Sequence, residues 1–290
     1  MSSVCVRVLG GSVLPALVCI GGCASRGPQL LPVSLPDLSR AAEPVRRQIG
    51  VRYTSLKLEI EHSTAPPADR ANAYGEMGKL LMAAEYRDAA EPCFLNAQAL
   101  MPGDARWPYY LAHLYRLRNE PEKSAAFFEK TLQLRPDDVA ALVWLGGVSL
   151  LQGRPEAAEP LFRKAMSLQP HVAAALFGLG SAALARREYA AAAKYLEGAL
   201  AEDQRASIIH YPLAMAYRGL GELGKAEAHL RQRGHVEPAP PDPLMSELSG
   251  SLDSALVHEA LGVKALDQRE WRRRRHISAR ASSWRRTARR

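Results

Sequence analysis

The stretch LRPDDVAALVWLGGVSLLQGRPEAAEPLFRKAMSLQP, residues 134–170, decides the fold because it begins and ends on nearly the same motif. The prolines of its two end motifs are 34 residues apart, and the same interval continues on both sides. The prolines of the series are Pro102, Pro136, Pro170 and Pro238, and Gln204 stands where one more is due. A fixed period of this length is typical of repeat architectures, so we expect a solenoid of stacked helical units.

Small and large residues hold fixed positions within each unit when the units begin at residues 71, 105, 139, 173 and 207. The eighth residue is always small: Gly78, Ala112, Gly146, Gly180 and Ala214. So is the twentieth: Ala90, Ser124, Ala158, Ala192 and Ala226. Large apolar residues hold the seventh and twenty-fourth positions. Two antiparallel helices approach closely only where side chains are small, and bulky neighbours then fill the space between them.

This pattern resembles the tetratricopeptide repeat. The resemblance covers residues 71–238 as five repeats, which is more than half of the 290 residues. It implies an all-α fold, a right-handed superhelical solenoid of antiparallel helix pairs. The departures are modest. Pro108 lies in the fourth position of the second unit, where a first helical turn tolerates proline, and Arg233 replaces a small residue in the fifth unit.

The resemblance also implies a binding surface, because the first helices of such repeats line the concave face of the solenoid. The matching positions are Lys79, Met82, Arg106, Tyr109, His113, Arg116, Val143, Leu150, Phe177, Ser181, Tyr211, Met215 and Arg218. Their mixture of aromatic, apolar and cationic groups suits an extended peptide or an amphipathic helix with some negative charge. The asparagine and lysine set that holds chaperone C-terminal carboxylates in some family members is not reproduced, since only Lys79 fits.

The first residues look like an export signal. Arg7 precedes an uncharged run from Val8 to Gly22, too short for a membrane span of about 20 residues and closer to a signal peptide over 1–22. The letters IGGC, ending at Cys23, resemble the lipobox of bacterial lipoproteins, which implies lipidation of Cys23 and attachment at the cell envelope. The alternative is an incidental cysteine in a cytoplasmic protein. Residues 23–44 are rich in proline and are expected to form an extended tether.

Three further segments flank the repeats. Apolar residues at helical intervals predict an N-terminal helix over 45–62. Residues 239–253 are polar and rich in proline, and we expect a linker there. Residues 254–271 resume the repeat pattern as the first helix of a sixth unit, which stops in mid-unit.

An arginine-rich tail, residues 272–290, carries the net charge of the chain. It holds nine of the 38 basic residues and none of the 30 acidic ones, so the rest is close to neutral. Three explanations stay open: a segment that is not an evolved element, such as the product of a shifted reading frame; attraction to anionic membranes; and nucleic-acid binding. We expect a disordered tail that does not define the function.

Nothing in the sequence indicates catalysis. The motifs of zinc proteases, dinucleotide and phosphate sites and serine hydrolases are missing. The four cysteines have no zinc-binding spacing, and we expect His113 and His210 to pack or to line the groove. The sequence therefore predicts a non-catalytic protein-binding scaffold without metal or cofactor. Two alternatives stay open: an assembly or pilotin-type lipoprotein for envelope complexes, and the regulatory part of a longer protein.

Overall fold

The structure is a computed structural model that describes residues 28–61 and 64–252, and these residues fold into α-helices, one short 3-10 helix and connecting segments. The all-α fold class is therefore confirmed. Four of the sequence predictions lie outside the described residues: the signal peptide at 1–22, the lipidated Cys23, the helix at 254–271 and the tail at 272–290.

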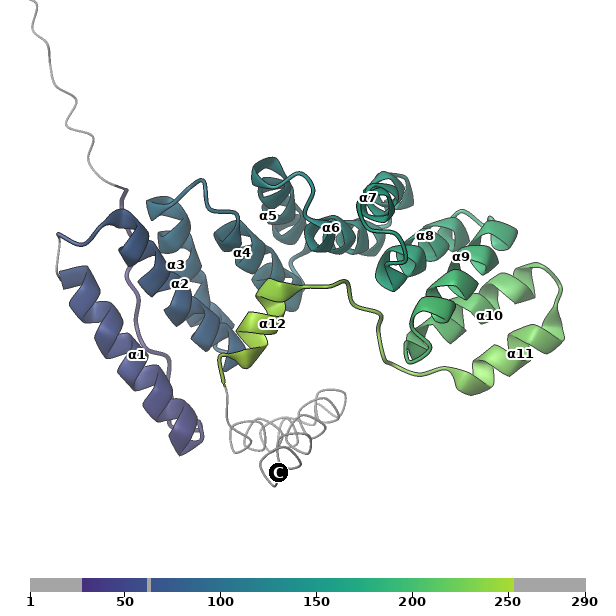
Figure 1. The fold of residues 1–290 in the computed structure, drawn as a ribbon. Coiled ribbons are helices and arrows are strands. Elements are labelled where there is room, and N and C mark those ends of the chain that lie inside the picture. Colours follow the sequence, from purple (N-terminus) through teal and green to yellow (C-terminus); the bar gives the residue numbers. More distant parts are fainter. Residues whose placement is uncertain (1–27, 62–63, 253–290) are drawn as a thin grey trace, which may run out of the picture.

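Five antiparallel helix pairs form the body of the molecule, stacked side by side into a curved array (Figure 1). The pairs are α2 (Pro67–Ala83) with α3 (Arg87–Leu100), α4 (Arg106–Leu117) with α5 (Pro121–Leu134), α6 (Val139–Leu151) with α7 (Pro155–Leu168), α8 (Ala173–Ala185) with α9 (Tyr189–Glu202), and α10 (His210–Gly219) with α11 (Leu223–Gln232). The 3-10 helix η1 (Ser207–Ile209) leads into α10. Each pair corresponds to one 34-residue unit of the sequence.

The small residues lie where the helices meet. Phe162 of α7 is buried between two glycines, Gly146 of α6 and Gly178 of α8, and a Cβ atom on either glycine would lie within 2.7 Å of its ring. A Cβ atom on Gly78 would meet the ring of Phe94 in the same way. The small and bulky positions that alternate in the sequence therefore pack against each other, both within a unit and between neighbouring units.

The turn inside each pair repeats as regularly as the helices do. Its central residue has a positive φ in every unit: Glu85 (72°), Asn119 (61°), Gly153 (70°), Arg187 (62°) and Gly221 (80°). The residue that follows donates its N–H to a carbonyl five residues earlier, as Tyr86 does to Leu81 and Glu222 to Tyr217, at 2.8 and 2.9 Å. This left-handed ending closes the first helix and reverses the chain.

The N-terminal part of the described chain is packed against the first pair. Helix α1 (Glu43–Glu61) covers the part of the chain for which a helix over 45–62 was predicted, and it packs on α2. Residues 28–38 are extended, as expected for the tether, but they lie on the body. The side chain of Asn96 accepts the N–H of Leu31 at 2.7 Å and donates to its carbonyl at 2.9 Å, and Tyr53 donates to the carbonyl of Val33 at 3.1 Å.

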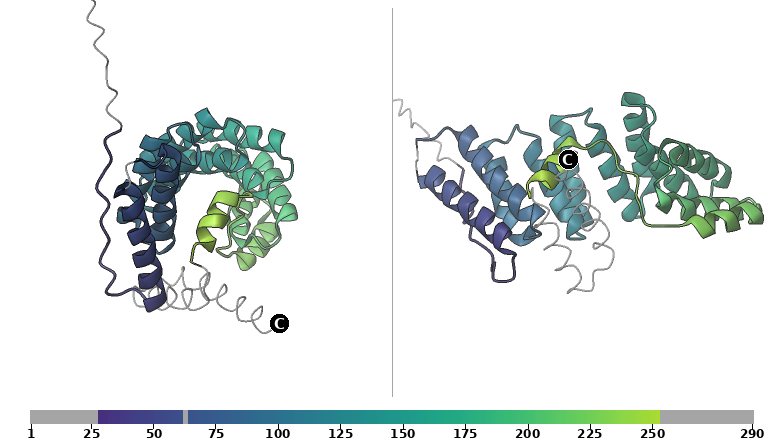
Figure 2. Two further views of the ribbon diagram at one scale, coloured as in Figure 1. Left: turned by 60° about the vertical axis from the view of Figure 1, so that its left-hand side comes forward. Right: turned by 60° about the horizontal axis from the view of Figure 1, so that its bottom comes forward.

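The segment expected to be a linker, 239–253, differs most from its prediction. After α11 the chain runs back along the concave side and forms α12 (Pro243–Gly250), which lies inside the curve of the solenoid (Figure 2). Asp242 starts this helix, because its carboxylate accepts the N–H of Met245 at 3.0 Å. The apolar residues Leu248 and Leu252 are buried in the core of the first units. Hydrophobic burial therefore turns a polar-looking linker into a docked helix.

Membrane insertion has no candidate within 28–61 and 64–252, where every helix is too short or too polar to cross a bilayer.

Candidate protein-binding groove

Helix α12 occupies the half of the concave groove that is formed by the first three repeats. Figure 1 shows it beside α4, Figure 2 shows it inside the curve of the solenoid, and it contacts α2. Its apolar residues Leu244, Met245 and Leu248 pack into the cores of these units. The groove is therefore seen in this structure with a helix bound in it, although that helix belongs to the same chain.

The N-terminal residue of this contact, Asp242, is held by two helices. Its Oδ2 atom accepts a hydrogen bond from the hydroxyl of Tyr109 at 2.5 Å and another from the indole Nε1 of Trp144 at 2.9 Å. The Nε2 atom of His113 lies 3.7 Å from the same oxygen. We call Tyr109, His113, Arg116 and Trp144 the carboxylate socket.

Edge-to-face and tilted aromatic packing holds the socket in place. The ring of His113 lies about 5 Å from the rings of Tyr109, Phe128 and Trp144, and the guanidinium of Arg116 lies 4.3 Å from the centroid of the Trp144 ring. Rings packed on several sides have little rotational freedom. The hydrogen-bond donors are therefore held in place before a carboxylate binds.

Burial decides the protonation of the socket. Burial and the charge of Arg116 hold the pKa of His113 well below its ordinary value, so this ring is neutral at neutral pH. Burial, together with the charge of Asp242, raises the pKa of the Tyr109 hydroxyl, which keeps its proton and donates it. The socket thus binds a carboxylate through neutral donors, with Arg116 as the nearby positive charge.

A second polar contact lies near the other end of α12. The ammonium of Lys79 on α2 is buried, with 4% of the residue exposed. It pairs with Glu247 of α12 and, at 2.6 Å, with Glu76 of its own helix. The hydroxyl of Tyr110 donates to the carbonyl of Leu244 at 3.4 Å. Helix α12 is consequently held through side chains and backbone along its length.

The other half of the groove is crossed by the chain that returns from α11. It contains a cavity of about 500 Å³ between α8, α10 and the chain that returns from α11. The cavity is lined by Phe177, Ser181, Ile208, Tyr211, Pro212, Arg233, Gly234 and His235. Tyr211 is 55% exposed. The returning chain is fixed here, because Gly234 donates to the carbonyl of Ser207 at 3.0 Å and Ile208 donates to that of Val236 at 3.1 Å.

The thirteen groove residues predicted from the sequence separate into groups in the structure. Lys79, Tyr109, His113 and Arg116 surround α12, and Phe177, Ser181 and Tyr211 line the open cavity. Met82 and Val143 are buried in the apolar core, and Leu150 is half-buried against it. Arg106 turns back to Asp104, at 2.6 Å. Met215 is half-buried and Arg218 is exposed. As partner-binding residues, all thirteen stay predictions.

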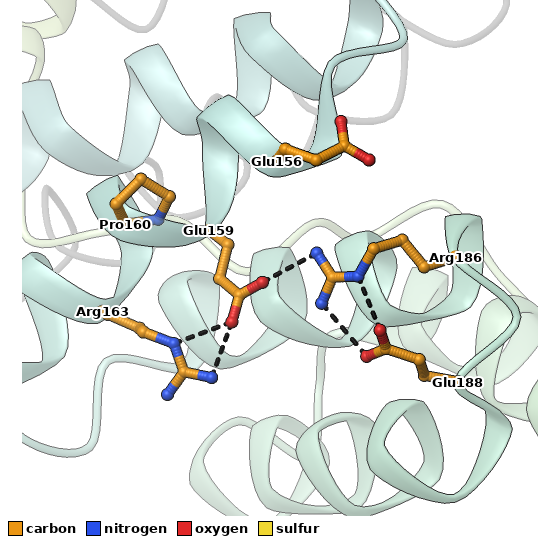
Figure 3. Close-up of a pocket in the computed structure, with 6 residues that line it drawn as sticks. All are labelled: Glu156, Glu159, Pro160, Arg163, Arg186 and Glu188. Atoms are coloured by element: carbon orange, nitrogen blue, oxygen red, sulfur yellow. Dashed lines mark hydrogen bonds and ion pairs between the residues drawn. The ribbon is translucent and has the colours of Figure 1, made fainter.

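A second hollow, between α7 and the start of α9, is lined by charges that pair with one another (Figure 3). Glu159 accepts from Arg163 at 2.6 Å and from Arg186 at 2.7 Å, and Arg186 also pairs with Glu188 at 2.8 Å. The hydrogen bond from Arg163 lowers the pKa of Glu159. These pairs join the third and fourth repeats, so the hollow is better explained by the packing of repeats than by a ligand.

Metal and thiol chemistry have little basis in the described part of the chain. No cluster of His, Cys, Asp and Glu within 28–61 and 64–252 is arranged to hold a metal ion. Cys93 is a free, buried thiol, and its burial raises its pKa to about 12. A thiol with that pKa stays protonated and unreactive at neutral pH.

Sequence reasoning missed Trp144, Asp242 and Glu247. Trp144 lies one position beyond the groove positions of the family pattern, and the other two belong to the expected linker. A local signal for α12 was present. Asp242 followed by Pro243 is a favourable start for a helix, and aliphatic residues follow at 244, 245 and 248.

Comparison with known sequences identifies the repeats. The tetratricopeptide repeat profile matches residues 76–139, 128–173, 150–207 and 177–234, which together span more than half of the chain. The chain belongs to the tetratricopeptide repeat family. Members of this family are typically non-catalytic scaffolds that bind proteins or peptides. No curated protein matches the chain.

Solved structures of several repeat proteins share the fold. A tetratricopeptide repeat protein from Parabacteroides merdae aligns with a TM-score of 0.55 at 18% identity, over 83% of this chain and 93% of its own. YrrB, described as a TPR protein with an unusual peptide-binding site, aligns with a TM-score of 0.51 at 17% identity, over 63% and 91%. A chain of the APC/C hetero-tetramer Cut9–Hcn1 aligns with a TM-score of 0.52 at 16% identity, over 80% and 42%. At these identities the likeness concerns the fold alone.

Proposed function

We propose that the chain is a non-catalytic scaffold that binds an acidic amphipathic helix of a partner protein in its concave groove. The observation that carries this proposal is α12, an eight-residue helix with an acidic residue at its start and aliphatic residues along it, bound between α2, α4 and α6. A surface that binds this helix within its own chain has the shape and the polar groups to bind a similar helix from another protein.

The two halves of the groove have different roles in this proposal. The socket and Lys79 provide donors and positive charge for an acidic helix. The open cavity around Phe177 and Tyr211 provides aromatic surface for residues that precede or follow it. Aromatic anchors on a concave surface commonly contribute much of the affinity of an interface. YrrB shares this fold and has a peptide-binding site, which is in line with such a role.

A direct test uses a chain whose own α12 is released. Asp242→Asn, Leu244→Ser and Leu248→Ser together remove the carboxylate and two apolar anchors from the occupant and leave every groove residue unchanged; we call this variant the emptied chain. A fluorescent peptide with the sequence of residues 237–252 is then titrated with it, and anisotropy is measured. We expect saturable binding of this peptide and none of a scrambled peptide of the same composition. Equal anisotropy for both peptides would rule out the proposal.

We also propose that the protein is exported and anchored by a lipid on Cys23. The support is the IGGC sequence with an uncharged run before it and a proline-rich segment after it. In cells labelled with a fatty acid, the protein is expected to carry the label and to partition into detergent, and Cys23→Ser is expected to abolish both. Retention of both properties by Cys23→Ser would contradict the anchor.

A further inference from the structure

We infer that the groove selects its partner by one side-chain carboxylate. This carboxylate belongs to the residue that caps the N-terminus of the partner's helix. The inference rests on the proposed function and specifies the partner: a segment with the chemistry Asp-Pro-Leu-Met-x-Glu-Leu, which α12 presents within this chain. The receiving site is the carboxylate socket, Tyr109, His113, Arg116 and Trp144.

The two carboxylate oxygens of Asp242 accept hydrogen bonds from different elements. Oδ1 accepts the N–H of Met245 at 3.0 Å and so closes the first turn of α12. Oδ2 accepts from Tyr109 at 2.5 Å and from Trp144 at 2.9 Å. A single carboxylate group in this position therefore both starts the bound helix and attaches that helix to the groove. A segment without it loses both interactions.

Within the described part of the chain, the Asp242 carboxylate accepts three hydrogen bonds and donates none. The three donors are a phenol hydroxyl, an indole N–H and a backbone N–H. An ionised carboxylate only accepts hydrogen bonds and satisfies all of them. An asparagine amide would bring its NH₂ group against one of these donors and would carry no charge. The socket therefore distinguishes aspartate from its closest isostere.

An independent observation points to an anion at the same place. Among residues 28–61 and 64–252, neither ring nitrogen of His113, a residue with no exposed surface, has a hydrogen-bond partner, and the Nε of Arg116 is also buried without one. The Nε2 atom of His113 lies 3.7 Å from Oδ2 of Asp242. Buried polar atoms without partners cost free energy. Both groups lie near the Asp242 carboxylate, and Glu237 is a second acid whose charge acts on Arg116.

The second acid sets the spacing of the motif. Glu247 follows Asp242 by five residues and pairs with the buried ammonium of Lys79. Between the two acids, Leu244 and Met245 pack against the repeat cores. A helix that satisfies the socket and Lys79 together must have its aliphatic residues in this register, so the two polar contacts also fix the orientation of the partner.

The experiment compares two peptides on the emptied chain. One has the sequence of residues 237–252, and the other differs only by asparagine at the position of Asp242. We expect the asparagine peptide to bind about 10- to 100-fold more weakly, the loss expected when charge-assisted hydrogen bonds to buried donors are removed.

A reciprocal variant removes the donors of the socket and keeps its rings. In the emptied chain with Tyr109→Phe and Trp144→Phe, the preference for the aspartate peptide should shrink severalfold, because the two hydrogen bonds that favour it are gone while the charge of Arg116 remains. If both peptides bind the emptied chain equally well, the socket inference is wrong and the proposed function stands. If neither peptide binds, the proposed function fails together with the inference. An undiminished preference for aspartate in the reciprocal variant would mean that the hydrogen bonds from Tyr109 and Trp144 do not provide the selectivity, and it also overturns the inference.

Discussion

Asp242 and Trp144 are 98 residues apart in the sequence, yet the carboxylate of one accepts the indole N–H of the other at 2.9 Å. This hydrogen bond joins the segment after the fifth repeat to the first helix of the third repeat. Because the same carboxylate starts α12, its loss affects both the helix and its attachment. Two consequences can be measured, one on the helix itself and one on the groove around it.

For the helix, Asp242→Asn should release α12 without unfolding the repeats. The change removes the charge that Tyr109 and Trp144 bind, although asparagine can still cap a helix, so the amides of 244–250 should exchange with solvent at least about tenfold faster. Hydrogen–deuterium exchange followed by mass spectrometry reports this directly, and the amides of α6 should keep their protection. Asp137→Asn is the matched control, since Asp137 is an exposed carboxylate that pairs with Lys164 at 3.1 Å. Faster exchange in both variants would argue for a general effect of charge.

For the groove, stability should fall as the pH drops below about 6.5. The folded-state pKa of His113 is lowered by burial, so the unfolded chain binds a proton that the folded chain excludes. The stabilisation that comes from keeping His113 neutral is complete above the unfolded pKa of about 6.5. Below that pH the free energy of unfolding decreases by up to about 1.4 kcal/mol per pH unit. Denaturant titrations between about pH 7.5 and about pH 5 measure how the unfolding free energy changes with pH.

His113→Phe keeps an aromatic ring beside Phe128 and Trp144 and should make this pH slope shallower. His210 and His229 will keep part of it, because burial lowers their pKa values as well. An unchanged slope in His113→Phe would show that this histidine is not excluded from protonation.

Two adjacent glycines of α6 should respond oppositely to the same substitution. Gly146→Ala places a Cβ 2.7 Å from the ring of Phe162, which cannot retreat because Gly178 lies against its other side. We expect a loss of about 1 to 3 kcal/mol of unfolding free energy. Gly147→Ala meets nothing within 4 Å and should gain up to about 1 kcal/mol from helix propensity. Chemical denaturation of the two variants provides the comparison, and a similar loss in both would contradict the packing described for Phe162.

The turns inside the repeats allow a similar test. Gly221 has a φ of 80°, where a side chain is strained, so Gly221→Ala should cost about 1 kcal/mol. Gly224→Ala, three residues on in α11, meets no neighbouring atom and should be neutral or slightly stabilising. Thermal unfolding of the pair would show the difference. Equal melting temperatures would mean that the turn accommodates the side chain.

The repeats could be predicted from sequence because their contacts are local and periodic. Gly146 and Phe162 meet inside one unit, so the same two positions recur every 34 residues and reveal the pairing. The turn residue is equally regular in structure but hidden in sequence, since Glu85, Asn119 and Arg187 have little in common except their positive φ. The rest of the backbone imposes that conformation on them.

The occupied half of the groove was beyond sequence reasoning for a different reason. Eight residues give a weak helical pattern, and α12 becomes favourable only once Tyr109, Trp144 and Lys79 have been brought together from three helices. The extended segment at Leu31 is similar, because its partner Asn96 lies 65 residues further along the chain. Contacts of this kind depend on the finished surface and leave no period in the sequence.

The place of α12 in the chain also has a consequence for the order of folding. Repeat arrays fold through contacts between neighbours and can propagate from one unit to the next, whereas α12 makes contacts across 98 to 168 residues. Contacts at such separations form late. During synthesis the first three repeats leave the ribosome well before residue 252 does, because translation adds about 5 to 20 residues per second. The groove therefore exists, for several seconds, before its own occupant has been made, and in that interval only another molecule can fill it.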